Sequence, residues 1–383
     1  MAPVVYQSPW MNDELRMFRK SVRQFIEREF VPHQACWRQQ HRPDVEAWTA
    51  AGGNGLLLPD VPDEYGGGGG TFAHQAVVVE ELAHAGVQFG STIHNVVAHN
   101  IIAFGTDEQK RNWLPRMARG ELVGAIAMSE PAAGSDLQGI KTTARRDGDH
   151  YVINGSKTFI TNGWHAGVVC LAVKTDARAA GPRGISLIIV EPKGLSGYRV
   201  GRSLDKVGMH GQDTYELLFD DVHVPASNLL GPAEGGGFAQ LMEIMSYERL
   251  AIAVAAVATS EEAVAMTTKY VKERIAFGKP LSDLQNTRFK LAECKTEARI
   301  GRVFLDDCIE RFIAGGLDDT TASMAKYWLT DCECRIVDEC VQLHGGYGYL
   351  AEYPIARMWT DSRVHRIWAG ANEILKELIA SSL

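Results

Sequence analysis

Residues 245–258, MSYERLAIAVAAVA, form the stretch around which the rest of the chain must be arranged. From Leu250 to Ala258 no side chain is polar, so a helix over these residues would be apolar on every side and would belong in a protein interior. A carboxylate, Glu248, nevertheless stands at the entrance of this apolar run, where burial would penalise its charge.

Two interpretations of Glu248 compete. In the first, Ser246 caps the start of a helix and Glu248 lies in its first turn, where the helix dipole favours an acid. In the second, Glu248 is a general base whose pKa is raised by a dry pocket. Because acids are common in first helical turns, this stretch alone favours the first interpretation.

The composition of the whole chain bounds the class of protein. Its 383 residues suffice for two or three domains with a large core, and its net charge of −8 gives no electrostatic footprint for nucleic acid. The seven cysteines lack the spacing of a disulfide framework or a metal site, so we expect free thiols in a reducing compartment and no metal. We also expect no membrane span and a cytoplasmic, bacterial-type protein, because neither a long apolar segment nor a signal or convincing transit peptide is evident.

Hydrophobic periodicity divides the chain into three regions. The first has the three- and four-residue spacing of helices, the second has the period of two that is typical of strands, and the third is helical again. We predict an α+β fold in which an antiparallel β-barrel or sandwich is inserted between two helical domains. The predicted domains cover residues 1–122, 123–234 and 235–383.

Glycine marks several predicted turns. The pair Asn154-Gly155 lies between two short alternating runs, which is a strong hairpin signal. The glycine run over residues 66–70 lacks the spacing of a phosphate loop and indicates a flexible turn. Towards the C-terminus the patterns predict helices over residues 283–315, 321–346 and 372–380. No dinucleotide-binding fingerprint is found, so a nicotinamide cofactor is not expected.

Five motifs resemble those of the acyl-CoA dehydrogenases, a family of flavoproteins, in the order and at the spacing of that family. They are AIAMSEPAAGSDLQGIKTTA (125–144), NGSKTFITNG (154–163), VKERIAFGKPLSDLQ (271–285), CVQLHGGYGYLAEYPIARMWTDSRV (340–364) and RIWAGANEILKELIA (366–380). The resemblance covers almost the whole chain. It implies an N-terminal helical domain, a central β domain and a C-terminal four-helix bundle. It also implies FAD as cofactor, an acyl-CoA substrate, electron-transfer flavoprotein as electron acceptor, and a homotetramer built as a dimer of dimers.

The resemblance places the flavin ring against the central domain. Ser129 matches a hydroxyl that contacts the ring, and Thr161 matches the hydroxyl near flavin N5. Phe159 replaces a tryptophan of many members and would stack on the flavin. Ser135 would touch a phosphate of the cofactor or the pantetheine of the substrate. The implied flavin-binding positions in this region are Met128, Ser129, Gly134, Ser135, Phe159, Ile160 and Thr161.

The adenine-dinucleotide part of FAD is held mostly by a neighbouring subunit in this family. The matching positions here are Arg274, Phe277, Gln285, Gln342, Gly345 and Gly346. Glycines at such positions let the backbone approach a pyrophosphate closely. Ala371 and Glu373 complete the implied cofactor positions. The family usually has threonine where this chain has Ala371, so one hydrogen bond to FAD is expected to be missing.

The position of the catalytic base differs between members of the family. Short- and medium-chain members carry a glutamate in a YEGT stretch, whereas the matching residues here are WAGA, with Ala369 at the position of the acid. Long-chain and isovaleryl-type members carry the base before an Arg-Leu pair, which is Glu248 here. The resemblance therefore implies that Glu248 removes the pro-R α-proton while the β-hydrogen leaves as hydride. The implied substrate-binding residues are Ser135, Ser246, Arg249, Ala369 and Gly370.

The resemblance determines the reaction better than the acyl group. Long-chain and branched acyl-CoAs are the leading substrates, and short branched (isovaleryl-type) or isoprenoid (citronellyl-type) acyl-CoAs are the alternative. A flavin oxidase or monooxygenase on the same fold is a weaker hypothesis, since a positioned base counts against most monooxygenase relatives. A non-catalytic scaffold is weaker still, because Glu248 and the region from Ser129 to Thr161 are intact.

Overall fold

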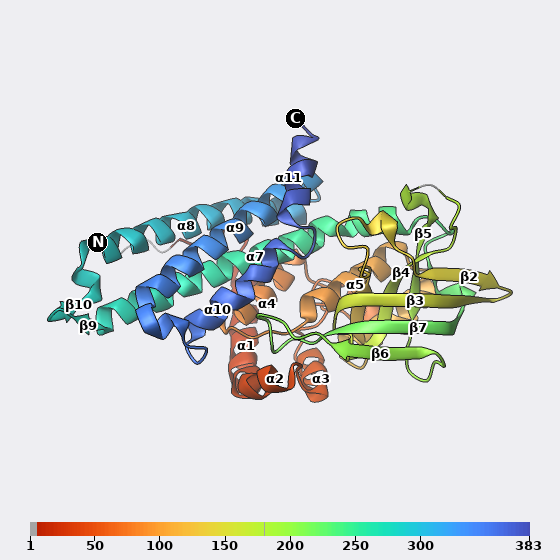
Figure 1. The fold of residues 1–383 in the computed structure, drawn as a ribbon, viewed down its shortest axis with the longest axis horizontal. Coiled ribbons are helices and arrows are strands. Elements are labelled where there is room, and N and C mark those ends of the chain that lie inside the picture. The colour runs from red at the N-terminus through yellow and green to blue at the C-terminus, as the bar shows by residue number, and fades with distance from the viewer. Residues whose placement is uncertain (1–5, 180) are drawn as a thin grey trace.

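The structure is a computed structural model that describes residues 6–179 and 181–383. The molecule is elongated, with a helical bundle at one end, a β layer at the other end and the N-terminal helices packed below the junction (Figure 1). The predicted order of helices, strands and helices is therefore observed.

The N-terminal region contributes α1 (Asp13–Phe25), α2 (Gln34–Gln40), α3 (Val45–Gly53), α4 (Phe72–His84), α5 (Ser91–Phe104) and α6 (Asp107–Ala118). The side chains of Asn12, Thr71 and Thr106 cap α1, α4 and α6. The glycine run before α4 is a closed turn, because the N–H groups of residues 66–70 all donate to backbone carbonyls between residues 58 and 63. These N–H groups are consequently not free to bind a phosphate.

The β layer is one eight-stranded sheet with the strand order β6-β7-β3-β2-β4-β5-β8, and β1 pairs with β4. Its strands are β1 (Val123–Ala127), β2 (Thr143–Asp147), β3 (His150–Thr161), β4 (Ala166–Lys174), β5 (Ile185–Val190), β6 (Tyr198–Ser203), β7 (Thr214–Pro225) and β8 (Leu229–Leu230). On β4 and β5, alternate residues join apolar clusters on opposite faces, so this part of the sheet is buried on both sides.

The predicted β domain is confirmed, but its sheet is mixed and not antiparallel throughout. Strand β1 runs parallel to β4 along most of its length, and Thr143 of β2 also pairs with Lys174 of β4 in the parallel sense. Alternating hydrophobicity identifies a strand but carries no information on the direction of its partner. Parallel pairing of β1 with β4 needs a crossover, which the β2–β3 hairpin provides between them.

The predicted hairpin at Asn154-Gly155 is wrong. Both residues lie inside the continuous strand β3, where the pairing with β7 shifts its register between Ile153 and Gly155. Gly155 has a φ of 147°, and a Cβ there would lie 2.5 Å from Thr142 Oγ1. Glycine thus permits a bulge and a close approach of the chain. The actual hairpin joins β2 to β3 and pairs Asp147 with His150.

The C-terminal region forms the bundle from α7 (Gly237–Glu273), α8 (Gln285–Ile313), α9 (Asp319–His344), α10 (Pro354–Ser362) and α11 (Asn372–Ala380). The predicted helices over 283–315, 321–346 and 372–380 correspond to α8, α9 and α11. Helix α7 runs from the β layer into the bundle and contacts α4, α5, α8 and α9 (Figure 1). Of the described helices, α7 alone is long and apolar enough to cross a membrane, but its apolar window is 72% buried, as in a core helix.

The start of α7 overturns the first interpretation of Glu248. The helix begins at Gly237, more than two turns before Ser246, so Ser246 is not an N-cap and Glu248 is not in the first turn. The early turns are stabilised by packing on β5, since a Cβ at Gly237 would lie 2.6 Å from the carbonyl carbon of Ser186. This tertiary contact overrides the low helix propensity of the glycine-rich segment.

Candidate active site

Glu248 lies on α7 in the interior of the protein. Only 4% of its surface is exposed, and within the described part of the chain its Oε2 atom has no hydrogen-bond partner. Burial raises the pKa of Glu248 to about 7, against the opposing positive charges of Arg249 and Lys326. A carboxyl group of this kind takes up a proton near neutral pH, as a general base must.

The neighbours of Glu248 on α7 are tied to α9 rather than to the carboxylate. Arg249 Nη1 donates to Ser323 Oγ at 3.2 Å, and Ser246 Oγ is hydrogen-bonded to Asp319 Oδ1. Because consecutive helical residues point about 100° apart, Arg249 does not neutralise Glu248 directly. Ser246 and Arg249 are both buried beside the base, and a role in lining the substrate channel remains a prediction for both.

The loop before α11 carries the other predicted substrate residues. Ala369 adopts a left-handed backbone with a φ of 50°, and the Gly370 carbonyl accepts a hydrogen bond from Lys326 Nζ at 2.8 Å. Ala371 is the N-cap of α11 and provides no side-chain cap, while Glu373 is exposed in the first turn. Since the charge of Lys326 also acts on Glu248, α9 brings the base and this loop into one neighbourhood.

Two segments of the β layer bring the predicted flavin-ring residues together. The Ser129 carbonyl accepts the N–H of Thr158 at 3.0 Å, which joins the loop after β1 to β3. On β3, Ile160 is buried while Phe159 is 69% exposed, at a bulge between Lys157 and Ile160. An exposed aromatic ring beside partly exposed hydroxyls at Ser129 and Thr161 suits a planar ligand. Met128 is half-buried, whereas Gly134 and Ser135 lie exposed on the loop between β1 and β2.

A buried ion pair that the sequence analysis missed fixes the Ser129 loop. Lys157 Nζ donates to the Met128 carbonyl at 2.9 Å and to Glu130 Oε1 at 2.8 Å. The Glu130 carboxylate in turn accepts the N–H groups of Lys141 at 2.6 Å and Thr142 at 3.0 Å. Burial lowers the pKa of Lys157 to about 8. The pair is separated by 27 residues in the chain, so no local pattern identifies it.

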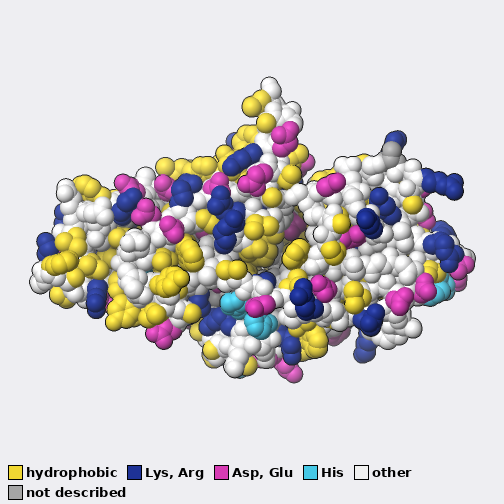
Figure 2. Space-filling model, in the orientation of Figure 1, with side chains coloured by type: hydrophobic (Ala, Val, Ile, Leu, Met, Phe, Trp, Pro, Cys, Tyr) yellow, Lys and Arg dark blue, Asp and Glu magenta, His cyan; other side chains and the backbone are white. Residues whose placement is uncertain are grey.

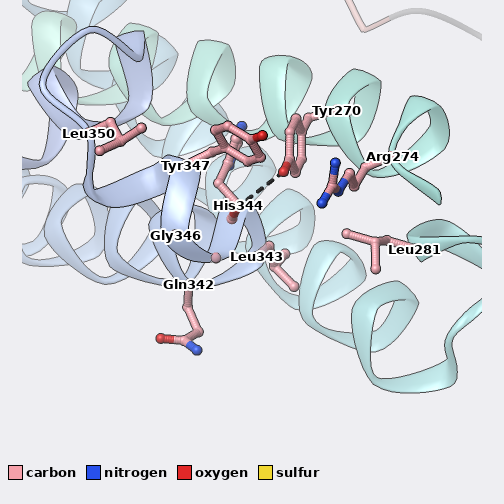
Figure 3. A pocket seen from close by; sticks show the side chains of 10 residues that line it. Tyr270, Arg274, Leu281, Gln342, Leu343, His344, Gly346, Tyr347 and Leu350 are labelled. Carbon is pink, nitrogen blue, oxygen red and sulfur yellow. Dashed lines mark hydrogen bonds between the residues drawn. The ribbon is translucent and has the colours of Figure 1, made fainter. Parts of the chain in front are cut away.

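A separate cavity of about 460 Å³ lies at the far end of the bundle, where α7 and α9 end. Four of the predicted cofactor residues line it: Arg274, Gln342, Gly345 and Gly346. Figure 3 shows the Arg274 side chain beside Tyr270 and Leu281, which the sequence analysis missed. The predicted residues Phe277 and Gln285 do not line this cavity, and both are exposed.

This cavity suits the phosphate-bearing part of FAD. A Cβ on either Gly345 or Gly346 would have no other atom within 4 Å, so the backbone at both positions borders open space. Gly345 has a φ of 58° and a ψ of −140°, which is close to a region that glycine alone adopts readily. Arg274 adds a positive charge, and guanidinium groups bind phosphates well.

The two halves of the predicted cofactor site are far apart within one chain. Glu248 lies on α7, and Arg274 directly follows the last residue of this helix, 26 positions later. This spacing places them roughly 39 Å apart along the helix axis. Glu248 and the Arg274 cavity therefore lie in separate regions of the bundle and do not share one pocket within the chain.

Three predicted site residues share an uncommon backbone conformation. Phe159, Phe277 and Ala369 have φ values of 60°, 53° and 50°. Left-handed conformations of residues other than glycine cost free energy and are concentrated at binding and active sites. The three strained positions lie in the β layer and the bundle, and their roles in the site remain predictions.

Comparisons with known proteins establish the family of the chain. The family models for the acyl-CoA dehydrogenase N-terminal, middle and C-terminal domains match residues 12–121, 125–222 and 235–383. The mitochondrial long-chain specific acyl-CoA dehydrogenase of Sus scrofa is 45% identical over 375 residues, which cover 97% of this chain and 87% of the relative.

Solved structures show the same relationship. An acyl-CoA dehydrogenase from Geobacillus kaustophilus superimposes with a TM-score of 0.96 at 47% identity, over 98% of this chain and 99% of that chain. A glutaryl-CoA dehydrogenase from Mycobacterium smegmatis in complex with FADH2 has a TM-score of 0.90 at 27% identity, over 97% and 95% of the two chains. The chain belongs to the acyl-CoA dehydrogenase family and is an FAD-dependent oxidoreductase. The fold and the family expected from the motifs are both confirmed.

Proposed function

We propose that the enzyme dehydrogenates a saturated acyl-CoA to the trans-2-enoyl-CoA, with Glu248 as the base that removes the α-proton. The observation that carries this proposal is the state of the Glu248 carboxyl group, which is buried, has one unpartnered oxygen and has a pKa raised to about 7. Ala369 has no side chain that accepts a proton, so the task falls to Glu248.

Each part of the site has a distinct task in this reaction. The bound FAD supplies the acceptor for the β-hydrogen, which leaves as hydride. The backbone N–H of Ala369 orients the thioester carbonyl and stabilises the negative charge that develops on it when the α-proton leaves. A bound acyl chain excludes water from Glu248, which keeps the carboxylate poorly solvated and basic. Ser129, Phe159 and Thr161 would hold the flavin ring, and the Arg274 cavity of a neighbouring chain would hold the phosphates.

We propose a long-chain or branched acyl group as the substrate. The 45% identity to a long-chain specific relative supports this choice, as does the placement of the base on α7. The small side chain of Ala369 leaves room near the loop before α11, so short branched and isoprenoid acyl groups form the alternative class. Reduction experiments with both classes distinguish them.

We propose a homotetramer that passes electrons to electron-transfer flavoprotein. The separation between Glu248 and the Arg274 cavity supports the oligomer, because an FAD bound near Glu248 would then take its phosphate contacts from a second copy of the chain. Hydrophobic side chains are exposed over the bundle end in Figure 2, and Ile275, Phe277 and Phe289 are 56%, 92% and 56% exposed. A cytoplasmic location completes the proposal, since all seven cysteines are free thiols.

The test is an anaerobic titration of the purified protein with straight and branched acyl-CoAs, followed through the visible flavin spectrum. We expect one class to bleach the flavin band. The Glu248→Gln variant should keep its flavin. The rate at which acyl-CoA reduces this flavin should fall by orders of magnitude, because the amide does not accept the α-proton. Glu243→Gln, on an exposed part of the same helix, is the matched control and should behave as the wild type.

Other outcomes would contradict the proposal in different ways. Near-normal reduction of Glu248→Gln would remove Glu248 as the base. A yellow protein that no acyl-CoA reduces would favour an oxidase or monooxygenase. A colourless protein that does not take up FAD would favour a scaffold.

A further inference from the structure

A buried lysine connects Glu248 to the loop before α11. Lys326 lies on α9 with 0% of its surface exposed. Its Nζ atom donates to the Gly370 carbonyl at 2.8 Å and to Asn372 Oδ1 at 3.0 Å. A buried ammonium group needs such acceptors, because an unpaired charge in the interior is costly. The two hydrogen bonds therefore attach the loop firmly to α9.

Asn372 is held from α9 by further contacts. Its Nδ2 atom donates to the Tyr327 carbonyl at 3.1 Å, to Thr330 Oγ1 at 3.0 Å and to Asp331 Oδ1 at 3.0 Å. Short-range contacts with residues on little more than one turn of α9 thus fix the end of the loop. Such over-determination is what keeps a strained residue such as Ala369 in its left-handed conformation.

Lys326 also influences the ionisation of the base. The charged groups that act on Lys326 are Glu248 and Arg249 from α7, Asp331 from α9 and Glu373 from α11. Burial lowers the pKa of Lys326 to about 7, and the charge of Glu248 opposes this effect. Reciprocally, the positive charge of Lys326 opposes the rise in the pKa of Glu248 that burial causes.

We propose that Lys326 is a positioning residue for α-proton removal, which holds the backbone of residues 369–370 in place and, in its protonated form, places a positive charge in the neighbourhood of Glu248. The inference rests on the proposed function, because Lys326 has this task only if Glu248 is the base. The N–H of Ala369 must meet the thioester carbonyl as charge develops on it, and a shift of about 1 Å in such a group costs on the order of 100-fold in rate.

The test is the pH dependence of kcat, with flavin content and Tm, for Lys326→Met, Lys326→Arg and Asn372→Ala. Lys326→Met should keep its flavin, lose on the order of 100-fold in kcat and shift the acidic limb of the profile upwards by roughly one unit. Lys326→Arg keeps the charge and should retain the wild-type limb. Asn372→Ala keeps the charge but loses loop contacts, so kcat should fall at an unchanged limb.

The controls separate this inference from the proposed function. Lys376→Met removes a half-exposed lysine on α11 and should leave the profile unchanged. A wild-type protein whose flavin no acyl-CoA reduces would overturn the proposed function and this inference together. An active wild type and an inactive Glu248→Gln, combined with wild-type profiles for Lys326→Met and Asn372→Ala, would overturn this inference alone. If Lys326→Met does not fold, an unchanged kcat in Asn372→Ala still overturns it.

Discussion

Lys157 Nζ lies 2.8 Å from Glu130 Oε1 inside the β layer, and the same ammonium group donates to the Met128 carbonyl at 2.9 Å. Met128 and Glu130 flank Ser129 in the chain, so the contacts of Lys157 fix the backbone on both sides of Ser129. Removing one partner leaves the other charge buried and unpaired, which is a strongly destabilising change.

Replacement of Lys157 by methionine should therefore lower both the stability and the flavin content. We expect a loss of about 3–5 kcal/mol in the free energy of unfolding. Denaturant unfolding monitored by circular dichroism gives the stability, and the ratio of visible to ultraviolet absorbance gives the flavin content. Lys141→Met, at an exposed position that joins the network only through its backbone N–H, is the control. Equal stability of both variants would show that the ion pair does not support the loop.

The pH dependence of stability should reveal the state of Glu248. Its pKa is raised from an ordinary value of 4.5 to about 7, so the folded protein binds this proton more tightly than the unfolded chain does. Stability is therefore lost as the pH rises from about 4.5 to about 7, where the buried carboxyl group ionises. Glu248→Gln avoids this loss and should be more stable than the wild type at pH 8 by up to about 3 kcal/mol.

Thermal unfolding at pH 5 and pH 8 measures this effect. The two proteins should have similar Tm values at pH 5 and should differ at pH 8, with the variant higher. A constant difference at both pH values would contradict the raised pKa. The activity of the wild type should change in the opposite sense, rising through pH 7 as the base becomes ionised.

Sequence patterns predicted the helices of the bundle well because their signals are local. The glycine pair after residue 314 and the strict periodicity before it place the end of α8 within two residues. The start of α7 was missed because it depends on the contact of Gly237 with β5, which no local pattern contains. The hairpin predicted at Asn154-Gly155 was wrong for a similar reason, since the close approach of Thr142 determines the conformation of Gly155.

The candidate site could be predicted only where it follows a motif. Glu248 and the glycines 345–346 stand in such motifs, and the structure gives physical reasons for each. Lys326 lies outside the motifs, and Lys157 lies in NGSKTFITNG without a role that the motif predicts, because their acceptors lie 44 and 29 residues away along the chain. Lysines are seldom buried, so composition favours solvent exposure for both, and only the tertiary structure reveals the oxygen atoms that surround them.

Replacement of Gly346 by alanine should weaken FAD binding without harming the fold. A Cβ at this position meets no protein atom within 4 Å, and Gly346 lines the cavity that the phosphates of FAD would occupy. We expect an unchanged Tm of the flavin-free protein and a lower affinity for FAD, measured by fluorescence titration. Gly316→Ala, beyond α8, is the control and should bind FAD normally, because a Cβ there would make only an ordinary contact of 3.9 Å with the Arg311 carbonyl oxygen. Equal FAD affinities would place the phosphates elsewhere.

Replacement of Ala371 by threonine separates two effects of this position. Ala371 is the N-cap of α11 with extended dihedral angles, a φ of −54° and a ψ of 145°, and it offers no side-chain acceptor to the first turn. A threonine hydroxyl there accepts a backbone N–H and should stabilise the flavin-free protein by about 1 kcal/mol. If the hydroxyl also contacts FAD, the affinity for FAD should rise by up to about tenfold, which corresponds to one net hydrogen bond.

Thermal unfolding of the flavin-free protein measures the contribution of the cap, and FAD titration measures the contribution of the cofactor contact. Ala371→Ser, which caps the helix without the methyl group, should give the same signs, whereas a gain in stability without a gain in affinity would assign Ala371 to the helix alone.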